Sequence, residues 1–504
     1  MSGIKMEYKK WKYRYNGTKT CWYDTFLYYE LIHTIISVSH TKLTLKLLIL
    51  QLFLSIGLFT GRLLSYVHHH SKVSLKNIKT IIINRSDRIG DAVLTMPLLE
   101  IFIDECRVQW YTGHFVILAS KLNFFVLSPL EKYEWVTVEL SDIDLPEYVQ
   151  GIGSLFRKIQ DRVLRTFFVH TTHPKDTTTL LLDFMANGDA AIPLSYRENS
   201  NPLIFGLNAL TSTILYDRSL PRALVHHSNS NLIETYVSLL EDSITEMRSL
   251  RERVYDTNFE DFYPTIEAIY PEIYKNEFDL RSHALKECYE WRWYYEKLNE
   301  SEKEVAMRRN SEVLKNWRSK KQSKDTILIF LGAYSIRSLP TDTWWKIISN
   351  IAEEFPEKTV LLMDGPENSV LREVWMKEFP PNVVNFWAIV PLKVFALVAS
   401  KCGHVIGLDG GGINFVRRFT NSLSIFTFAN PLVWQAFSGH KNRTIMKGSD
   451  GWSIGNFHPK DEWITIGDMS RSHYLLPTFN IAQAKILVEN IDTQLICEWI
   501  KKSA

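Results

Sequence analysis

Short apolar runs alternate with helical patterns over much of the chain. The first such unit begins with the apolar run Ile78–Ile83, continues through a polar, glycine-containing turn, and leads into a helical pattern over Asp91–Ile103. Pro97 lies inside that helix, and we expect a kink there because proline removes an internal hydrogen bond. Phe115–Leu118 and Thr166–His170 are predicted to be further strands. Alternation of this kind predicts a parallel, doubly wound α/β sheet.

A second unit with the same rhythm occupies the C-terminal part of the chain. In its first helix, Trp345, Ile348 and Ile351 have the spacing of one apolar helical face. The predicted strands are Thr326–Leu331, Thr359–Met363, His404–Leu408 and Ser424–Phe428, and the predicted helices are Trp344–Glu354, Lys393–Ser400 and one beginning at Ile413.

Two further stretches differ from these units. Residues 231–324 are charged and aromatic with helical spacing, which indicates a helical connection or insert, and residues 1–75 form an N-terminal extension. The predicted domains are therefore the extension 1–75, a first lobe 76–230, the helical segment 231–324 and a second lobe 325–504. We leave open whether the last helix of the chain packs back on the first lobe.

Within the extension, Leu47–Thr60 is almost wholly apolar and lies between Lys46 and Arg62. It is shorter than the roughly 20 residues that a membrane-spanning helix needs. One interpretation is a helix lying on an anionic lipid surface, which the basic flanks favour. The other is a helix buried against the protein's own core.

Composition narrows the class of protein. The 504 residues suffice for two substantial domains, and 58 basic against 56 acidic side chains give a net charge of only +2. Such a balance gives no global reason to expect nucleic-acid binding. The 5 cysteines are scattered without metal-ligand or redox spacing, which is typical of reduced thiols in a cytosolic protein.

Asp91 is the first candidate for chemistry, because it follows a buried strand directly. In open α/β sheets, ligands bind outside the carboxyl ends of the strands. Asp91 is either a general base that deprotonates an attacking hydroxyl or a first-turn acid that stabilises its helix. Arg85 and Arg88 would keep its carboxylate ionised and could contact an anionic acceptor.

The second lobe carries a candidate donor site. Its glycine-rich segment Asp409–Asn414 stands between a strand and a helix, where backbone N–H groups can approach a diphosphate, although a plain tight turn has the same composition. Asp409 would cap the helix or orient the loop or a sugar hydroxyl. Arg337 could bind phosphate, and Glu367 could accept hydrogen bonds from a ribose; a surface arginine and a helix-capping acid are the alternatives. The candidate donor-binding residues are Arg337, Glu367, Asp409, Gly410, Gly411, Gly412 and Asn414.

Taken together and in order, these motifs resemble the heptosyltransferase family of lipopolysaccharide synthesis, glycosyltransferase family 9. The stretch Arg85–Leu99 matches the family pattern R-x-D-R-I-G-D-x-V-L-T-x-P-L-L. The family loop D-[ST]-G-x-x-H corresponds to Asp409–Asn414, with Gly410 in place of Ser or Thr and Asn414 in place of His. Arg337–Pro340 corresponds to the family's K-x-W-P, with arginine in place of lysine.

The resemblance implies a GT-B fold, in which two Rossmann-like lobes face a cleft, and an inverting transfer of a heptose or related sugar. The donor would be a nucleotide-diphosphate sugar, and the acceptor a lipopolysaccharide or other envelope glycan, lipid-linked or oligosaccharide. Asp91 would be the catalytic base, Arg337 would hold the diphosphate, and Asp409–Gly412 would bind the nucleotide-sugar. We expect no cofactor and no metal, because no DxD pair stands at the end of a strand predicted above. The protein would be cytoplasmic, or peripheral at the inner face of the cytoplasmic membrane.

Two other classes of function compete with this one. A non-catalytic scaffold in envelope glycan assembly would use the extension and the helical segment to bind partners. A nucleotide-dependent oxidoreductase is disfavoured, because the glycine-rich loop lacks the G-x-G-x-x-G spacing and does not follow the first strand of its unit.

Overall fold

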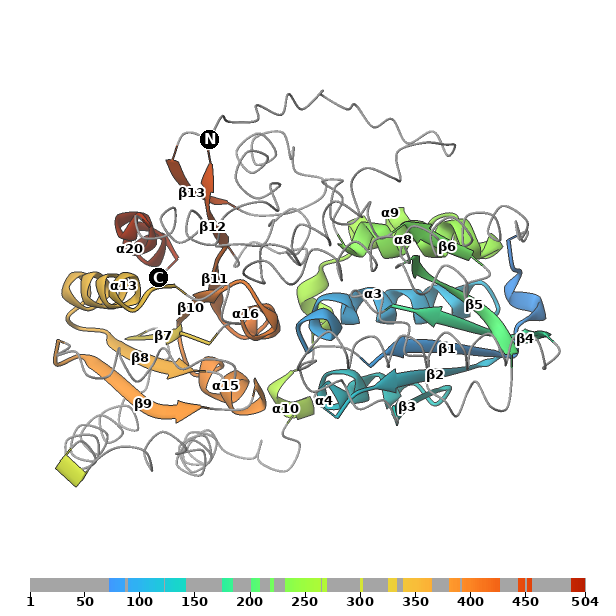
Figure 1. Ribbon diagram of the computed structural model, residues 1–504, viewed down its shortest axis with the longest axis horizontal. Helices are drawn as coiled ribbons and strands as arrows, with labels where there is room; N and C mark the ends of the chain where they lie inside the picture. Colours follow the sequence, from blue (N-terminus) through green and yellow to red (C-terminus); the bar gives the residue numbers. More distant parts are fainter. Residues whose placement is uncertain are drawn as a thin grey trace, which may run out of the picture.

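The computed structural model consists of two α/β lobes that lie side by side (Figure 1). The residues that it describes are 72–86, 89–121, 123–141, 175–184, 201–208, 218–221, 232–263, 265–269, 300–301, 325–332, 339–364, 380–389, 392–426, 443–448, 451–455 and 491–503.

The first lobe is built on a sheet of six parallel strands in the order β3-β2-β1-β4-β5-β6. Ile81 and Ile83 of the central strand enter one apolar core and Ile82 enters another, because successive side chains of a strand point to opposite faces. Burial on both faces explains the unbroken apolar run in the sequence. The strands are β1 (Thr80–Arg85), β2 (His114–Ala119), β3 (Val136–Leu140), β4 (Lys175–Asp183), β5 (Asn201–Asn208) and β6 (Arg218–Pro221).

Three longer helices cover one face of this sheet, and α8 contacts β5, β6 and α3 (Figure 1). They are α3 (Ile89–Val108), α8 (Leu232–Ser243) and α9 (Leu250–Asp256). The short helical elements are η1 (Leu75–Asn77), α4 (Phe124–Leu127), η2 (Ser128–Lys132), η3 (Thr245–Met247), η4 (Phe259–Phe262) and α10 (Ile266–Ile269). The start of the predicted helical segment, up to α9, is therefore helical and packs on the first lobe, whereas 270–299 and 302–324 lie outside the described residues.

The second lobe contains a seven-stranded sheet in the order β13-β12-β11-β10-β7-β8-β9. All neighbouring strands are parallel except β12 and β13. Counted within each lobe, the six parallel strands have the same order, 3-2-1-4-5-6, which is that of a Rossmann fold. Two such lobes make a GT-B fold, so the predicted fold class is confirmed. The strands are β7 (Thr326–Phe330), β8 (Thr359–Asp364), β9 (Val383–Ile389), β10 (His404–Leu408), β11 (Asn421–Ile425), β12 (Arg443–Gly448) and β13 (Gly451–Gly455).

The helices of the second lobe are α13 (Thr341–Glu354), α15 (Leu392–Ala399), α16 (Gly411–Val416) and α20 (Thr493–Lys502). Helix α20 packs against α13 (Figure 1), where Asn350 Nδ2 donates to Thr493 Oγ1 over 2.6 Å. Asn421 Nδ2 also donates to the carbonyl oxygen of Ser503, over 3.0 Å. The idea that the last helix packs back on the first lobe is therefore wrong, because its apolar face is buried against its own lobe.

Several predicted element boundaries differ from those in the structure. Strand β1 begins at Thr80 because Ile78 closes the turn of η1, its N–H bonding to the Leu75 carbonyl. Helix α3 continues through Pro97 as far as Val108. In α13, Ile348 and Ile351 of the predicted apolar face are fully buried, but Trp345 is 38% exposed and Trp344 is buried in its place. The predicted strand Thr166–His170 lies outside the described residues.

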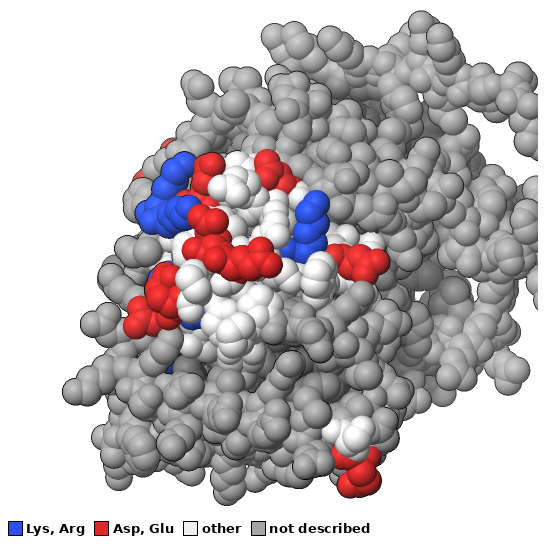
Figure 2. All heavy atoms as spheres, turned by 90° about the vertical axis from the view of Figure 1, so that its left-hand side faces the viewer, with Lys and Arg blue, Asp and Glu red and all other residues white. Residues whose placement is uncertain are grey.

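The outer end of the second lobe is charged and solvated (Figure 2). Exposed acidic residues of α13 and α20 lie there among lysines. Two ion pairs form between them, Lys501 with Glu354 and Lys502 with Glu498. Among the described residues in this view, acidic side chains cover more of the surface than basic ones. Among the helices in the described part of the chain, none is both long and apolar enough to cross a membrane. The segment Leu47–Thr60 lies outside that part.

Candidate functional site

The carboxyl ends of four central strands locate the candidate site. The strand order reverses direction between β1 and β4 in the first sheet and between β7 and β10 in the second. Ligands of open α/β sheets bind outside the strands at such switch points. Asp91 follows β1, and Asp409 follows β10, so both predicted acids stand at switch points.

Asp91 lies in the first turn of α3, where its side chain is partly exposed. Thr95 Oγ1 donates to the Asp91 backbone carbonyl over 2.8 Å, which holds the first turn of the helix. Among the residues that the structure describes, the Asp91 carboxylate has no hydrogen-bond or ion-pair partner. A partly exposed carboxyl at this position can meet a ligand outside the strand ends and act on its proton.

The glycine-rich segment of the second lobe meets this helix start directly. A Cβ built on Gly411 would lie 2.6 Å from Gly90 Cα and 2.8 Å from Gly90 N. The first residues of α16 and of α3 are thus in backbone contact, which a side chain at position 411 would prevent. The contact brings Asp91 next to the loop that begins at Asp409.

Two more contacts continue this seam between the lobes. The rings of Phe125 and Phe415 meet edge to face, with centroids 5.7 Å apart. Arg418 Nη1 donates to the carbonyl oxygens of Asp261, over 2.6 Å, and Tyr263. One apolar cluster includes residues of both lobes, so the seam is part of a common core.

The three glycines of the loop have different surroundings. Gly411 packs on Gly90, and a Cβ on Gly412 would lie 3.1 Å from the Phe330 ring. At Gly410 a Cβ would meet only the Leu408 carbonyl oxygen, at 4.0 Å, among the described atoms. Gly410 is therefore the glycine of the loop with space beside it. Asp409 and Asn414, which flank the glycines, are only 4% and 8% exposed.

The remaining predicted residues divide into two groups. Arg85 is fully buried, and its Nη1 donates to Tyr236 Oη over 3.4 Å while the guanidinium lies 5.9 Å from the centre of that ring. Its expected contact with an acceptor stays a prediction, since the described contacts of the side chain are with α8. Arg88, Arg337 and Glu367 lie outside the described residues.

Sequence reasoning missed Asp183, the last residue of β4. It is 1% exposed and accepts a hydrogen bond from Asn84 Nδ2 over 3.1 Å at the same switch point as Asp91. The available signal was the apolar run Leu180–Leu182 that ends in this acid. The polar, threonine-rich start of β4 concealed the strand.

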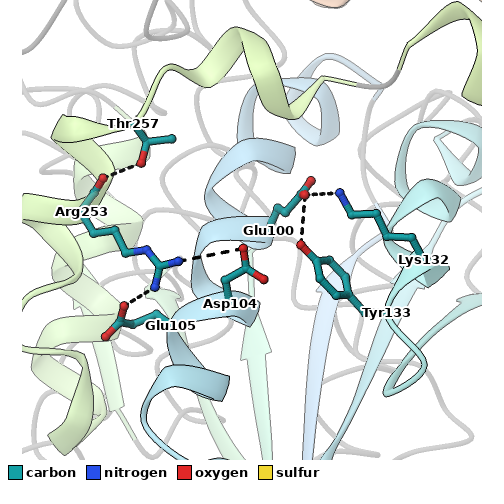
Figure 3. A network of polar contacts seen from close by, with 7 residues as sticks. All are labelled: Glu100, Asp104, Glu105, Lys132, Tyr133, Arg253 and Thr257. Carbon is teal, nitrogen blue, oxygen red and sulfur yellow. Dashed lines mark hydrogen bonds and ion pairs between the residues drawn. The ribbon is translucent and has the colours of Figure 1, made fainter.

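A second polar network fixes α3 from both sides (Figure 3). Glu100 binds Lys132 and accepts from Tyr133 Oη, while Arg253 of α9 forms ion pairs with Glu105 and Asp104. Burial, followed by the charge of Glu100, raises the pKa of Tyr133 well above its ordinary value, so this hydroxyl remains a donor. The helix that carries Asp91 is thereby tied to η2 and α9.

Within the described ranges, no three His, Cys, Asp or Glu side chains are grouped as a metal site requires.

Comparison with known proteins finds likeness in structure alone. No family model and no curated protein matches the sequence. The chain is similar to the glycosyl transferase family 9 structure from Veillonella parvula, with 12% identity, coverage of 84% of this chain and 99% of that chain, and a TM-score of 0.41. It is also similar to E. coli ADP-heptose lps heptosyltransferase II, with 12% identity, coverage of 84% and 98%, and a TM-score of 0.45. For E. coli heptosyltransferase WaaC with ADP, the identity is 9%, the coverage 84% and 100%, and the TM-score 0.43. Likeness at this level concerns the course of the chain and does not identify a reaction.

Proposed function

We propose that the chain is an inverting glycosyltransferase that moves a sugar from a nucleotide-diphosphate donor to a carbohydrate acceptor. The observation that carries this proposal is the contact between Gly90 and Gly411. It places the start of α3, which carries the candidate base, against the candidate donor loop, at the switch points of both sheets. In a direct displacement the base and the leaving group act on opposite sides of one sugar carbon, so both must border the same site.

In this reaction the donor lies on the second lobe and the acceptor on the first. Asp91 takes the proton of an acceptor hydroxyl as its oxygen attacks the anomeric carbon from the face opposite the nucleotide. The bond from that carbon to the diphosphate breaks, and the nucleoside diphosphate leaves with the electron pair. Backbone N–H groups near Gly410 and the charge of Arg337 stabilise the anion as it forms. No metal is required in this scheme.

The backbone contact limits where the donor can lie. Gly411 is covered by Gly90, so a diphosphate binds beside this contact, on the side of Gly410, or enters while the lobes are apart. The donor sugar is a heptose or a related sugar, and the acceptor a lipopolysaccharide or other envelope glycan. That choice rests on the motif resemblance of Arg85–Leu99 and on no contact in the structure. The same resemblance supports a site of action at the inner face of the cytoplasmic membrane.

The proposal is tested by a donor screen on the purified full-length chain. ADP-, UDP- and GDP-linked sugars are titrated calorimetrically, with and without EDTA, and transfer to glycan acceptors is followed by mass spectrometry. We expect one nucleotide class to bind and to be consumed equally well with EDTA. Gly410→Val should weaken donor binding, whereas Glu353→Gln on the exposed face of α13 should not. Absence of binding by every nucleotide-sugar would contradict the proposal and favour a scaffold.

A further inference from the structure

Three polar side chains form a buried hydrogen-bonded chain where β1 and β4 end side by side. Asn84 Nδ2 donates to Asp183 Oδ1 over 3.1 Å, and Ser86 Oγ donates to Asn84 Oδ1 over 2.8 Å. Asn84 and Asp183 are paired in register, and none of the three side chains is more than 1% exposed. Removing a carboxylate from water this completely costs several kcal/mol unless partners compensate. Packing alone therefore does not explain an acid here.

Asp183 sets the direction of donation along this chain. Asn84 turns its NH₂ toward Asp183 and its carbonyl oxygen toward Ser86, so the Asp183 carboxyl oxygen accepts. The Ser86 hydroxyl then donates its proton to Asn84. If the Asn84 side-chain amide were turned around, both of these hydrogen bonds would have to run in the opposite direction.

The same stretch of backbone is held from two other directions. Asn123 Nδ2 donates to the carbonyl oxygen of Arg85 over 2.8 Å. The Arg85 guanidinium donates to Tyr236 Oη, which in turn donates to the carbonyl oxygen of Phe184 over 2.7 Å. The end of β1 is thus tied to the loop after β2, to α8 and to the end of β4, immediately before α3 begins.

We propose that Asp183 is a positioning residue for Asp91 and acts through Asn84 and Ser86. These hydrogen bonds fix the end of β1, and the contact of Gly90 with Gly411 fixes the start of α3, so the described residues on both sides of 87–88 are held in place. Asp183 is too deeply buried to touch a substrate. The kinetic part of this inference rests on the proposed role of Asp91 as the base.

The first test uses the folded chain and needs no substrate. Hydrogen–deuterium exchange is followed in peptides covering 84–96 for the wild type, Asp183→Asn and Asp183→Ala. The asparagine variant keeps the shape and one acceptor oxygen but permits the Asn84 amide to reverse; the alanine variant removes the acceptor. We expect faster exchange in this region for both, more so for alanine, with peptides covering 404–416 unchanged. Unchanged exchange at 84–96 in both variants would overturn the proposal.

The second test separates a positioning role from a general loss of stability. We expect Asp183→Asn to lower kcat by about 10-fold, because a small displacement of a catalytic group costs up to roughly 100-fold, and to leave the Kd of the donor unchanged. In an Asp91→Asn background the same substitution should cause no further loss, because residues that act as a unit are not additive. If Asp183→Asn lowered kcat by the same factor in the Asp91→Asn background, the proposal that Asp183 acts through Asp91 would be overturned.

Glu105→Gln is the matched control. Glu105 is also a buried acid, 5% exposed, but it lies roughly 20 Å along α3 from Asp91 at 1.5 Å per residue. It should leave exchange at 84–96 unchanged, and faster exchange there would contradict a specific effect of Asp183. If the wild type transfers no sugar from any nucleotide, the proposed function fails, while the exchange measurement still decides the placement of the turn.

Discussion

Gly90 and Gly411 bring the backbones of two helix starts into contact across the seam between the lobes. Because a Cβ on Gly411 would lie 2.6 Å from Gly90 Cα, any side chain there requires one backbone to move. A Cβ on Gly90 is less restricted, with Gly411 N at 3.2 Å and Gly411 Cα at 3.3 Å. The contact therefore sets how closely the two lobes approach at the candidate site.

Gly411→Ala should destabilise the protein by about 1–3 kcal/mol, the usual cost of overpacking, despite the better helix propensity of alanine. Urea unfolding measures this loss, and small-angle scattering should show a larger radius of gyration as the lobes separate. Gly410→Ala is the control: any residue can adopt its φ of 168°, and among the described atoms a Cβ there would meet only the Leu408 carbonyl oxygen, at 4.0 Å. Equal stability of the two variants would show that the contact does not hold the lobes.

Trp344→Ala should cost about 3–5 kcal/mol, as is typical of large aromatic residues removed from a core. Trp344 is fully buried, whereas its neighbour Trp345 is 38% exposed. Trp345→Ala should therefore change the free energy of unfolding by less than about 1 kcal/mol. Denaturant unfolding of the two variants measures the difference, and a larger effect at Trp345 would contradict the orientation of α13.

His404 should make the protein less stable in mild acid. Burial, together with the charge of Lys358, lowers the pKa of His404 from 6.5 to about 4. The folded state therefore keeps His404 neutral, while the unfolded chain takes up a proton below pH 6.5. The free energy of unfolding therefore carries no penalty from His404 above pH 6.5. It falls by up to about 3 kcal/mol as the pH drops toward 4.

The substitution His404→Gln isolates this effect. Glutamine keeps a polar group for the 3.1 Å hydrogen bond between His404 Nε2 and Ser503 Oγ, but it does not titrate. Urea unfolding is measured at pH 7.5 and pH 4.5. The free energy of unfolding should fall less between these pH values for the variant than for the wild type, since the other titrating groups are common to both. Identical losses would show that His404 is not the group responsible.

The fold could be predicted where strands are short and apolar on both faces. The predicted strand His404–Leu408 coincides with β10, because every residue in it is buried. The end of α3 was missed because the helix is buried on almost every side from Ala92 to Cys106, which removes the polar face that marks helical periodicity. In α13, the spacing of Trp344, Ile347, Ile348 and Ile351 matches one helical face, so the prediction erred in starting that face at Trp345.

The candidate site was predictable only in part. Asp91 and Asp409 could be found because each follows an apolar strand within a recognisable local motif. The contact of Gly90 with Gly411 and the bond of Asn84 with Asp183 join residues far apart in the chain. Each depends on how strands and lobes are placed in space, which no local pattern encodes.

Turnover by the Asp91→Asn variant tests the central claim most directly. With the donor and acceptor found by the screen, we expect the rate to fall at least about 100-fold, the lower range for losing a general base. Donor affinity and the urea midpoint should stay at wild-type values, because the Asp91 side chain is partly exposed and the amide preserves its shape. A transfer rate like that of the wild type would contradict the assignment of Asp91 as the base.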